Sequence, residues 1–216
     1  MLNTLVIAAT TAEITPFLDL LRKPGNPLAN RNDIDILITG VGLTAATWAI
    51  TRQLHIKKPV EVIQAGLAGS FDRGIPLGSV LAVKQDLIAD QAVMESGSFK
   101  SISDLGLMDA NRYPYAKGWL INKSDLIKKT RLKKVKAISV NEISTSRQRI
   151  ASYRAAFDPA IESMEGAALH YCCLMENVPF IQLRAVSNYA GERNKRKWFM
   201  QESINNLNNE LVKLLT

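Results

Sequence analysis

TLVIAATTAEITPFLDLL, residues Thr4 to Leu21, contains the pattern that decides the fold. Its first six residues, Thr4 to Ala9, form an apolar run typical of a buried strand. The apolar side chains that follow recur at the i, i+3, i+4 and i+7 spacing of one helix face, at Ile14, Phe17, Leu18 and Leu21. The sequence therefore predicts a strand followed directly by an amphipathic helix.

The same alternation continues along the chain. We expect further strands at Ile34–Thr39, Val60–Gln64, Ser79–Ile88, Lys136–Val140, Ile161–Met164 and Pro179–Ser187, and helices at Leu43–Leu54, Met164–Met175 and Trp198–Leu215. Residues 90–132 have no clean period and several turn formers, which favours a long functional loop or lid with short helices. The pattern predicts one α/β domain, residues 1–216, around a central sheet.

Composition is that of an ordinary globular protein, with 47% hydrophobic and 22% charged residues among 216. The two cysteines, Cys172 and Cys173, are adjacent and cannot form a mutual disulfide in a helix, so we expect buried free thiols in a reducing compartment. The N-terminal stretch has no basic leader, and no apolar run approaches the ~20 residues that span a bilayer. We expect a cytoplasmic protein without a membrane partner.

The net charge of +7 is concentrated in two basic runs, Lys128–Lys136 and Arg193–Lys197. The first lacks interleaved aromatic residues, which indicates a solvated helix end and loop rather than a nucleic-acid surface. The second follows a motif described below. We expect no nucleic-acid partner.

Two features at the ends of predicted strands are candidates for chemistry, because open α/β sheets bind ligands there. Glu13 lies in the first turn after the first strand, where capping of the helix is the alternative to a functional role. AGLAG, Ala65 to Gly69, is predicted to be a glycine turn whose backbone approaches a ligand, with a tight turn of no function as the alternative. It lacks the residues of a phosphate-binding loop.

Two further strand ends carry polar side chains. SMEGAA, Ser163 to Ala168, places Glu165 at a helix start before small residues, and a carboxylate can accept hydrogen bonds from the two hydroxyls of a ribose. RAVSN, Arg184 to Asn188, ends on an amide that offers one donor and one acceptor. An acidic first turn and a simple turn are the respective alternatives.

In this order, the four features resemble the purine nucleoside phosphorylase and methylthioadenosine/S-adenosylhomocysteine nucleosidase superfamily. The resemblance covers nearly the whole chain and is densest in AATTAEI (Ala8–Ile14), QAGLAGSF (Gln64–Phe71), SMEGAALH (Ser163–His170) and RAVSNYAGERNKRKW (Arg184–Trp198). It implies a nucleoside phosphorylase/nucleosidase-like fold, a three-layer domain whose central mixed twisted sheet is flanked by helices.

The resemblance also implies roles for individual residues. Glu13 corresponds to the water-activating glutamate, Met164 and Glu165 to the ribose-binding pair, and Ser187 and Asn188 to the Ser-Asp pair that binds and protonates the purine. We expect Ala68, Gly69 and Ile143 to contact the substrate as well, with Ile143 against the purine. The resemblance implies no cofactor and no metal, and it suggests a homodimer.

Asn188 departs from the family pattern of the adenine-specific members, which have an aspartic acid there. An amide cannot act as a general acid, but it can accept a hydrogen from a protonated ring nitrogen and donate to a keto oxygen. That matches a 6-oxopurine such as hypoxanthine. The segment after the first strand has no arginine before Arg22, unlike that of the members that use phosphate, so water is the expected nucleophile.

The asparagine, GLAGSF, and the Gly191, Arg193 and Trp198 run together resemble the futalosine hydrolase family, which releases hypoxanthine from futalosine in the alternative menaquinone pathway. Arg193 is our preferred partner for the carboxylate of the substrate's 5′ arm, with Lys100 and Arg112 as competitors, and Phe99 and Leu105 are candidates to cover that arm. A methylthioadenosine/adenosylhomocysteine nucleosidase, an inosine phosphorylase and a non-catalytic nucleoside-binding protein are the alternatives.

Overall fold

The computed structural model describes residues 3–95 and 98–216 of the chain. Its strands are β1 (Thr4–Ala8), β2 (Ile34–Ile38), β3 (Glu61–Ser70), β4 (Val80–Asp86), β5 (Ala92–Glu95), β6 (Ser98–Ser101), β7 (Tyr115–Ala116), β8 (Trp119–Ile121), β9 (Lys134–Ser139), β10 (Ile161–Ser163) and β11 (Phe180–Tyr189). Its α-helices are α1 (Thr11–Arg22), α2 (Leu43–Ile56), α3 (Arg147–Phe157), α4 (Gly166–Met175) and α5 (Met200–Leu215). Short 3-10 helices lie at Pro27–Asn30, Asp125–Lys129 and Lys195–Lys197.

The central sheet is mixed, and its longest strands, β3 and β11, run parallel along their whole length. The first half of β3 pairs with β1, which in turn pairs with β2, all in parallel. The far end of β3 pairs with β10, and the circuit continues through β9 and β4 back to β11. These five strands therefore curl into a closed ring, which brings the ends of β1, β3, β10 and β11 near one another.

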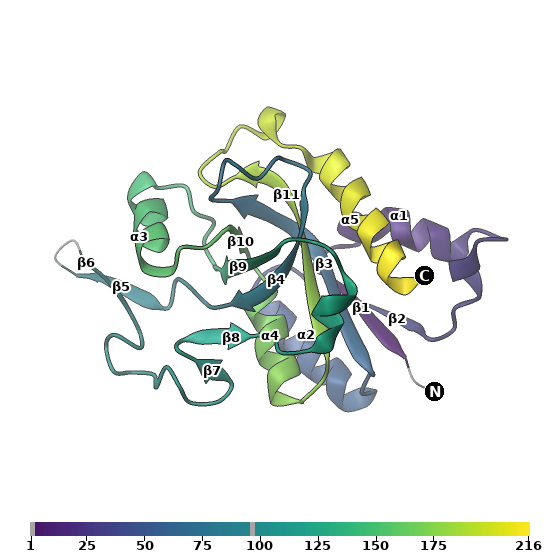
Figure 1. The fold of residues 1–216 in the computed structure, drawn as a ribbon, viewed down its shortest axis with the longest axis horizontal. Coiled ribbons are helices and arrows are strands. Elements are labelled where there is room, and N and C mark those ends of the chain that lie inside the picture. The colour runs from purple at the N-terminus through teal and green to yellow at the C-terminus, as the bar shows by residue number, and fades with distance from the viewer. Residues whose placement is uncertain (1–2, 96–97) are drawn as a thin grey trace.

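Helices cover both faces of the sheet, as Figure 1 shows, with α1 and α5 on one side and α2 and α4 on the other. The first interface packs α1 and α5 residues such as Phe17 and Leu211 against β1, β3 and β11. The second packs the apolar faces of α2 and α4, including Ile50 and Leu169, against the opposite side chains of β1 and β3. The expected three-layer α/β fold with a central mixed sheet is confirmed.

The predicted glycine turn at Ala65–Gly69 is wrong, because these residues lie inside β3, which continues to Ser70. Pairing with β11 on one edge keeps the backbone extended through both glycines. Gly66 and Gly69 serve a different need: an added Cβ at Gly66 would lie 2.3 Å from Nη1 of Arg184. The glycines make room for polar side chains of neighbouring strands rather than bend the chain.

The middle of the chain also differs from its prediction. Within residues 90–132, β5 pairs with β6 and β7 with β8, all antiparallel, and β8 pairs with β4 at the margin of the main sheet. One short 3-10 helix, Asp125–Lys129, matches the expected short helices, and the strands were not expected. Helix α3 was not predicted, since Tyr153 is its one buried residue and the apolar period is correspondingly weak. Partners far away in sequence stabilise these elements, and a local pattern does not reveal them.

Cys172 and Cys173 are buried free thiols, as expected. Within the described part of the chain, no helix combines the length and the apolar character needed to cross a membrane.

Candidate active site

A cavity of about 250 Å³ opens where β1, β3, β10 and β11 end and where α1 and α4 begin. It is lined by Ala9, Thr10, Glu13, Val41, Leu67, Ala68, Gly69, Val140, Ile143, Glu162, Ser163, Met164, Glu165, Ser187, Asn188, Trp198 and Met200. Eight of the nine residues predicted from the sequence to form the site are in this set. A larger hollow, of about 870 Å³, lies at the opposite strand ends near Val60 and Pro179, away from those residues.

Glu13 is fixed at the start of α1 by both of its carboxylate oxygens. Oε2 accepts hydrogen bonds from the backbone amide of Thr10 at 3.0 Å and from its hydroxyl at 3.3 Å. Oε1 reaches across to β3 and accepts from the amide of Leu67 at 3.0 Å. Glu13 therefore does cap α1, but only through Oε2. Its Oε1 is held at the cavity wall by Leu67.

Glu165 immediately precedes α4 and is 5% exposed. Its side chain makes no capping bond to its own helix. Oε1 instead accepts from the amide of Gly42, at the start of α2, at 3.1 Å. Oε2 lies 3.4 Å from Nη1 of Arg184. The side chain thus points into the cavity region, which excludes an acidic first turn as its sole role.

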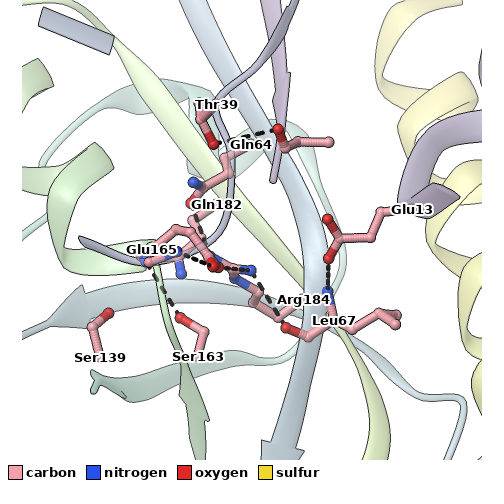
Figure 2. A network of polar contacts seen from close by, with 12 residues as sticks. Glu13, Thr39, Gln64, Leu67, Ser139, Ser163, Glu165, Gln182 and Arg184 are labelled. Atoms are coloured by element: carbon pink, nitrogen blue, oxygen red, sulfur yellow. Dashed lines mark hydrogen bonds and ion pairs between the residues drawn. The ribbon is translucent and has the colours of Figure 1, made fainter. Parts of the chain in front are cut away.

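Leu67 and Arg184 link the two glutamates, as Figure 2 shows. The amide of Leu67 donates to Glu13, and the carbonyl of the same residue accepts from Nη1 of Arg184 at 3.3 Å. Nη2 of Arg184 donates to Oε1 of Gln64 at 3.1 Å. The guanidinium is almost fully buried, and this set of acceptors fixes its plane.

A second layer of buried polar groups supports Arg184. In the amide orientation that satisfies both of its ends, the Gln182 oxygen accepts from Nε of Arg184 at 3.1 Å. Its nitrogen donates to Asp86 at 3.2 Å and to Nε2 of His170 at 2.9 Å. Burial raises the pKa of Asp86 to about 6, and burial lowers the pKa of His170 to about 4. At neutral pH the network therefore holds one guanidinium, one carboxylate and a neutral imidazole.

The same network fixes the start of α4. The Ser139 hydroxyl donates to Asp86 at 3.0 Å and accepts from the amide of Ala167 at 2.8 Å. Gly166 passes so close that a Cβ there would lie 2.2 Å from Asp86. The start of α4 is thus hydrogen-bonded, through Ser139, to Asp86, which belongs to the same network as Arg184, the ionic partner of Glu165.

Ser187 and Asn188 lie at the end of β11, at the other side of the cavity. The Ser187 hydroxyl donates to Oδ1 of Asn188 at 2.9 Å, and Nδ2 of Asn188 donates to the carbonyl of Tyr189 at 3.1 Å. A second lone pair on Oδ1 and a second N–H on Nδ2 are not used by these bonds. The amide fork is therefore held in one orientation with spare capacity for a ligand.

The apolar wall includes Ile143, which is 38% exposed, together with Met164 and the strand backbone at Ala68 and Gly69. Arg193 is the one predicted site residue outside the lining set. It is exposed and lies over the Trp198 ring, 5.8 Å from its centroid, and Trp198 itself lines the cavity. Phe99 and Leu105 do not line it either. Phe99 packs edge-on against Tyr153 and Phe157, and Leu105 is exposed.

Sequence reasoning assigned no role to Arg184 or Glu162. Arg184 is a charged residue inside the apolar strand β11, and Glu162 likewise interrupts the apolar approach to SMEGAA. A charge in a buried strand is the signal that singles out both, since such residues are almost never fully buried without a partner. Glu162 is 5% exposed and lines the cavity beside Asn188.

The lining set has a distinctive charge pattern. It contains three glutamates and, as far as the described residues go, no lysine, arginine or histidine. No cluster of three or more histidine, cysteine, aspartate or glutamate residues within 3–95 and 98–216 has an arrangement that would hold a metal ion. The polar groups that the cavity presents to a ligand are therefore carboxylates, one amide and hydroxyls. Arg184 is not in the lining set and is paired with Glu165.

Residues 28–216 match the family model of the phosphorylase superfamily, and the chain belongs to that superfamily. It is similar to the futalosine hydrolase of Thermus thermophilus, with 29% identity over 83% of this chain and 80% of that protein. It is also similar to a 5′-methylthioadenosine/S-adenosylhomocysteine nucleosidase of Haemophilus influenzae, with 28% identity over 74% of this chain and 69% of that protein.

Among solved structures, the futalosine hydrolase of Helicobacter pylori superimposes with a TM-score of 0.80 over 99% of this chain and 97% of that one, at 19% identity. This likeness confirms the fold. The relatives by sequence support the expectation that the protein is an N-glycosidase of the hydrolase class.

Proposed function

We propose that the protein hydrolyses the N-glycosidic bond of a purine nucleoside with a 6-oxopurine base, and that its substrate is futalosine. The products are then hypoxanthine and dehypoxanthine futalosine, as in the alternative menaquinone pathway. The observation that carries the proposal is Asn188, an oriented amide at the cavity wall where an adenine-specific enzyme has an acid. The similarity to a futalosine hydrolase over 83% of the chain supports it.

In the proposed mechanism the glycosidic bond lengthens first and the ribose takes on oxocarbenium character. Glu165 binds the 2′ and 3′ hydroxyls, since its carboxylate lies at the cavity wall with Gly42 and Arg184 as its only polar partners among the described residues. Asn188 and Ser187 stabilise the departing base, while Met164, Ile143, Ala68 and Gly69 shape the pocket around it. Glu13 removes a proton from the water that attacks the anomeric carbon.

The charge pattern of the cavity supports water rather than phosphate as the nucleophile. Glu13 and Glu165 in the lining repel a dianion, and no basic side chain in the described lining offsets them. A neutral water needs one general base, which Glu13 provides. We therefore propose hydrolysis, even though the superfamily takes its name from phosphorylases.

We further propose that the protein acts as a single nucleosidase domain in a cytoplasmic homodimer. Helix α2 leaves Trp48 65% exposed and the adjoining Val41 56% exposed, and Val41 also lines the cavity. An apolar face of this kind at the edge of a binding site is typical of a surface that a partner covers. Sedimentation velocity tests it: a monomer at micromolar concentration contradicts the proposal.

A chromatographic assay of the released base tests the function. The protein is incubated without phosphate on futalosine, inosine and methylthioadenosine, and free base is measured. Hypoxanthine from futalosine is the expected product. Adenine from methylthioadenosine would instead support the nucleosidase alternative, a strict phosphate requirement would support a phosphorylase, and binding without any release would support a non-catalytic nucleoside-binding protein.

A further inference from the structure

Glu162 lies beside Asn188 across a glycine of β3. Glu162 of β10 and Asn188 of β11 are both paired with Gly69, one from each edge of that strand. A Cβ at Gly69 would lie 3.3 Å from Nδ2 of Asn188 and 3.6 Å from Cγ of Glu162. The two side chains therefore lie over the same small gap, which is part of the cavity.

The carboxyl group of Glu162 is only half satisfied. Oε1 accepts from the amide of Ser144 at 3.2 Å, which fixes the side chain. Oε2 is buried and has no hydrogen-bond partner among residues 3–95 and 98–216. An unpaired buried carboxylate oxygen is costly, and protonation of that oxygen or a donor on a ligand removes the cost.

Its surroundings favour the protonated form more than water does. Burial raises the pKa of Glu162, and the hydrogen bonds from Ser144 only partly oppose that effect. The titratable groups that face it, Arg149 and Tyr153, both come from α3. Tyr153 is neutral because burial raises its pKa to about 12, and Arg149 is paired with Glu142 at 2.7 Å. A carboxyl group in this setting resembles general acids whose pKa is tuned upward by burial.

We propose that Glu162 is the general acid that protonates the leaving purine, a role that Asn188 cannot perform. The inference rests on the proposed N-glycosidase function. The C1′–N9 bond breaks and its electron pair passes to the base, while the Glu162 proton moves to ring nitrogen N7. The attacking water bonds to C1′ and gives one proton to Glu13. The cycle closes when a proton passes through solvent from Glu13 to Glu162, so the net reaction consumes one water.

This assignment separates two tasks that, by the family resemblance, one aspartate performs in the adenine-specific members. Glu162 supplies the proton, and the Asn188 fork recognises the keto group of the base. The arrangement predicts a titration on the basic side of the activity profile, because the acid must be protonated to act.

The test compares wild type with Glu162→Gln, which keeps an acceptor for the Ser144 amide but has no acidic proton. Hypoxanthine release from futalosine or inosine is measured as kcat across pH 5–9, with thermal unfolding as a check on the fold. We expect kcat of E162Q to fall ~10²–10⁴-fold at low pH, with the deficit shrinking as pH rises and the wild type loses its donor. Glu162→Asp, which restores a titratable acid, is expected to recover part of the rate and the pH dependence.

A second substrate sharpens the result. 4-Nitrophenyl riboside has a leaving group that departs as a stable anion, so the loss of rate in E162Q is expected to be much smaller on it than on inosine, whereas Glu13→Gln is expected to be slow on both substrates. A deficit of E162Q that does not vary with pH, or no deficit at all, overturns the inference and leaves the hydrolase function intact. If E162Q does not fold, the pH profile of E162D is the test. If E162D has the full wild-type rate and its activity declines at the same basic pH as that of the wild type, the inference is overturned. Failure of the wild type to release base from any nucleoside instead contradicts the proposed function.

Discussion

Arg184 and Glu165 form a buried ion pair, with Nη1 of the guanidinium 3.4 Å from Oε2 of the carboxylate and both side chains at most 6% exposed. The pair joins the middle of β11 to the start of α4, and through the backbone of Leu67 it is also linked to Glu13. Buried pairs are strongly destabilising to break, because the remaining charge has no partner. This geometry leads to a first prediction.

Arg184→Met is expected to lower the free energy of unfolding by about 3–5 kcal/mol at neutral pH, since it leaves Glu165 buried and unpaired. Urea denaturation of the variant measures the loss. Lys213→Met is the matched control, because it breaks an exposed pair with Glu210 and should change stability by under about 1 kcal/mol. The double variant R184M/E165M should recover part of the loss. If R184M and K213M lower the free energy of unfolding by the same small amount, the Arg184–Glu165 pair does not stabilise the fold.

Glu13→Gln is expected to reduce kcat for base release by ~10²–10⁴-fold while substrate affinity changes little, because the amide keeps the shape but cannot accept a proton from water. Steady-state kinetics and isothermal titration with the nucleoside measure the two effects. Glu202→Gln is the control, since Glu202 also lies in the first turn of a helix, α5, but is exposed. A rate for E13Q equal to that of E202Q removes Glu13 from the mechanism.

Asn188→Asp is expected to shift the preference between bases. The carboxylate can no longer donate to a keto oxygen, and a protonated carboxyl can donate to a ring nitrogen, so the ratio of adenine to hypoxanthine release should rise by ~10–100-fold, the effect of one mismatched buried hydrogen bond. Competition between inosine and adenosine analogues in one tube gives the ratio directly. Ser187→Ala serves as the comparison, because it loses a bond to Asn188 without changing its chemistry. An unchanged ratio in N188D means that Asn188 does not select the base.

Gly66→Ala is expected to destabilise the protein by about 1–3 kcal/mol and to lower kcat, because the new methyl group would lie 2.3 Å from Nη1 of Arg184 and 3.2 Å from Oε1 of Glu13. Gly69→Ala is the control, since its nearest contact is 3.3 Å. Thermal unfolding is compared for the two variants, and turnover of Gly66→Ala is compared with that of the wild type, because Gly69 itself lines the cavity. Equal stability in both would contradict the close packing of Arg184 against β3.

Asp86 and His170, two buried groups that both accept from the Gln182 amide, predict opposing pH dependences of stability. The pKa of His170 is lowered to about 4, so the unfolded state binds a proton first and stability is lost as pH falls from about 6.5 towards 4. The pKa of Asp86 is raised to about 6, so the native state binds a proton first and stability is gained as pH falls from about 6 towards 4. Each shift of somewhat over two units corresponds to about 3 kcal/mol.

Single variants separate the two effects. As pH falls from 7 to 4.5, the stability of His170→Gln should rise relative to that of the wild type, because only the Asp86 contribution is left. Over the same fall in pH, the stability of Asp86→Asn should drop relative to that of the wild type, because only the His170 contribution is left. Urea unfolding at both pH values gives the differences. Identical pH dependences in all three proteins would mean that neither group has a shifted pKa in the folded state.

Local patterns along the chain predict the class of fold and most of the residues that line the candidate site. Strand–helix periodicity, as in Thr4–Leu21, depends on local spacing, so it is visible in one dimension. Strand ends meet at one edge of a parallel sheet, so Glu13, Glu165 and Asn188 could be placed together without coordinates, and all three line one cavity. The composition likewise predicted the buried free thiols.

The contacts of those side chains depend on packing between elements that are far apart in the chain. The glycines of AGLAG favour a turn, but pairing with β11 keeps the segment extended, as between Ala65 and Leu183. Arg184 and Glu162 gained their meaning from groups on other strands and helices, since hydrogen-bond partners of buried charges are set by packing and not by neighbours in sequence. Arg193, chosen for its charge and motif, stacks on Trp198 outside the cavity, because the chain after β11 turns it towards the surface.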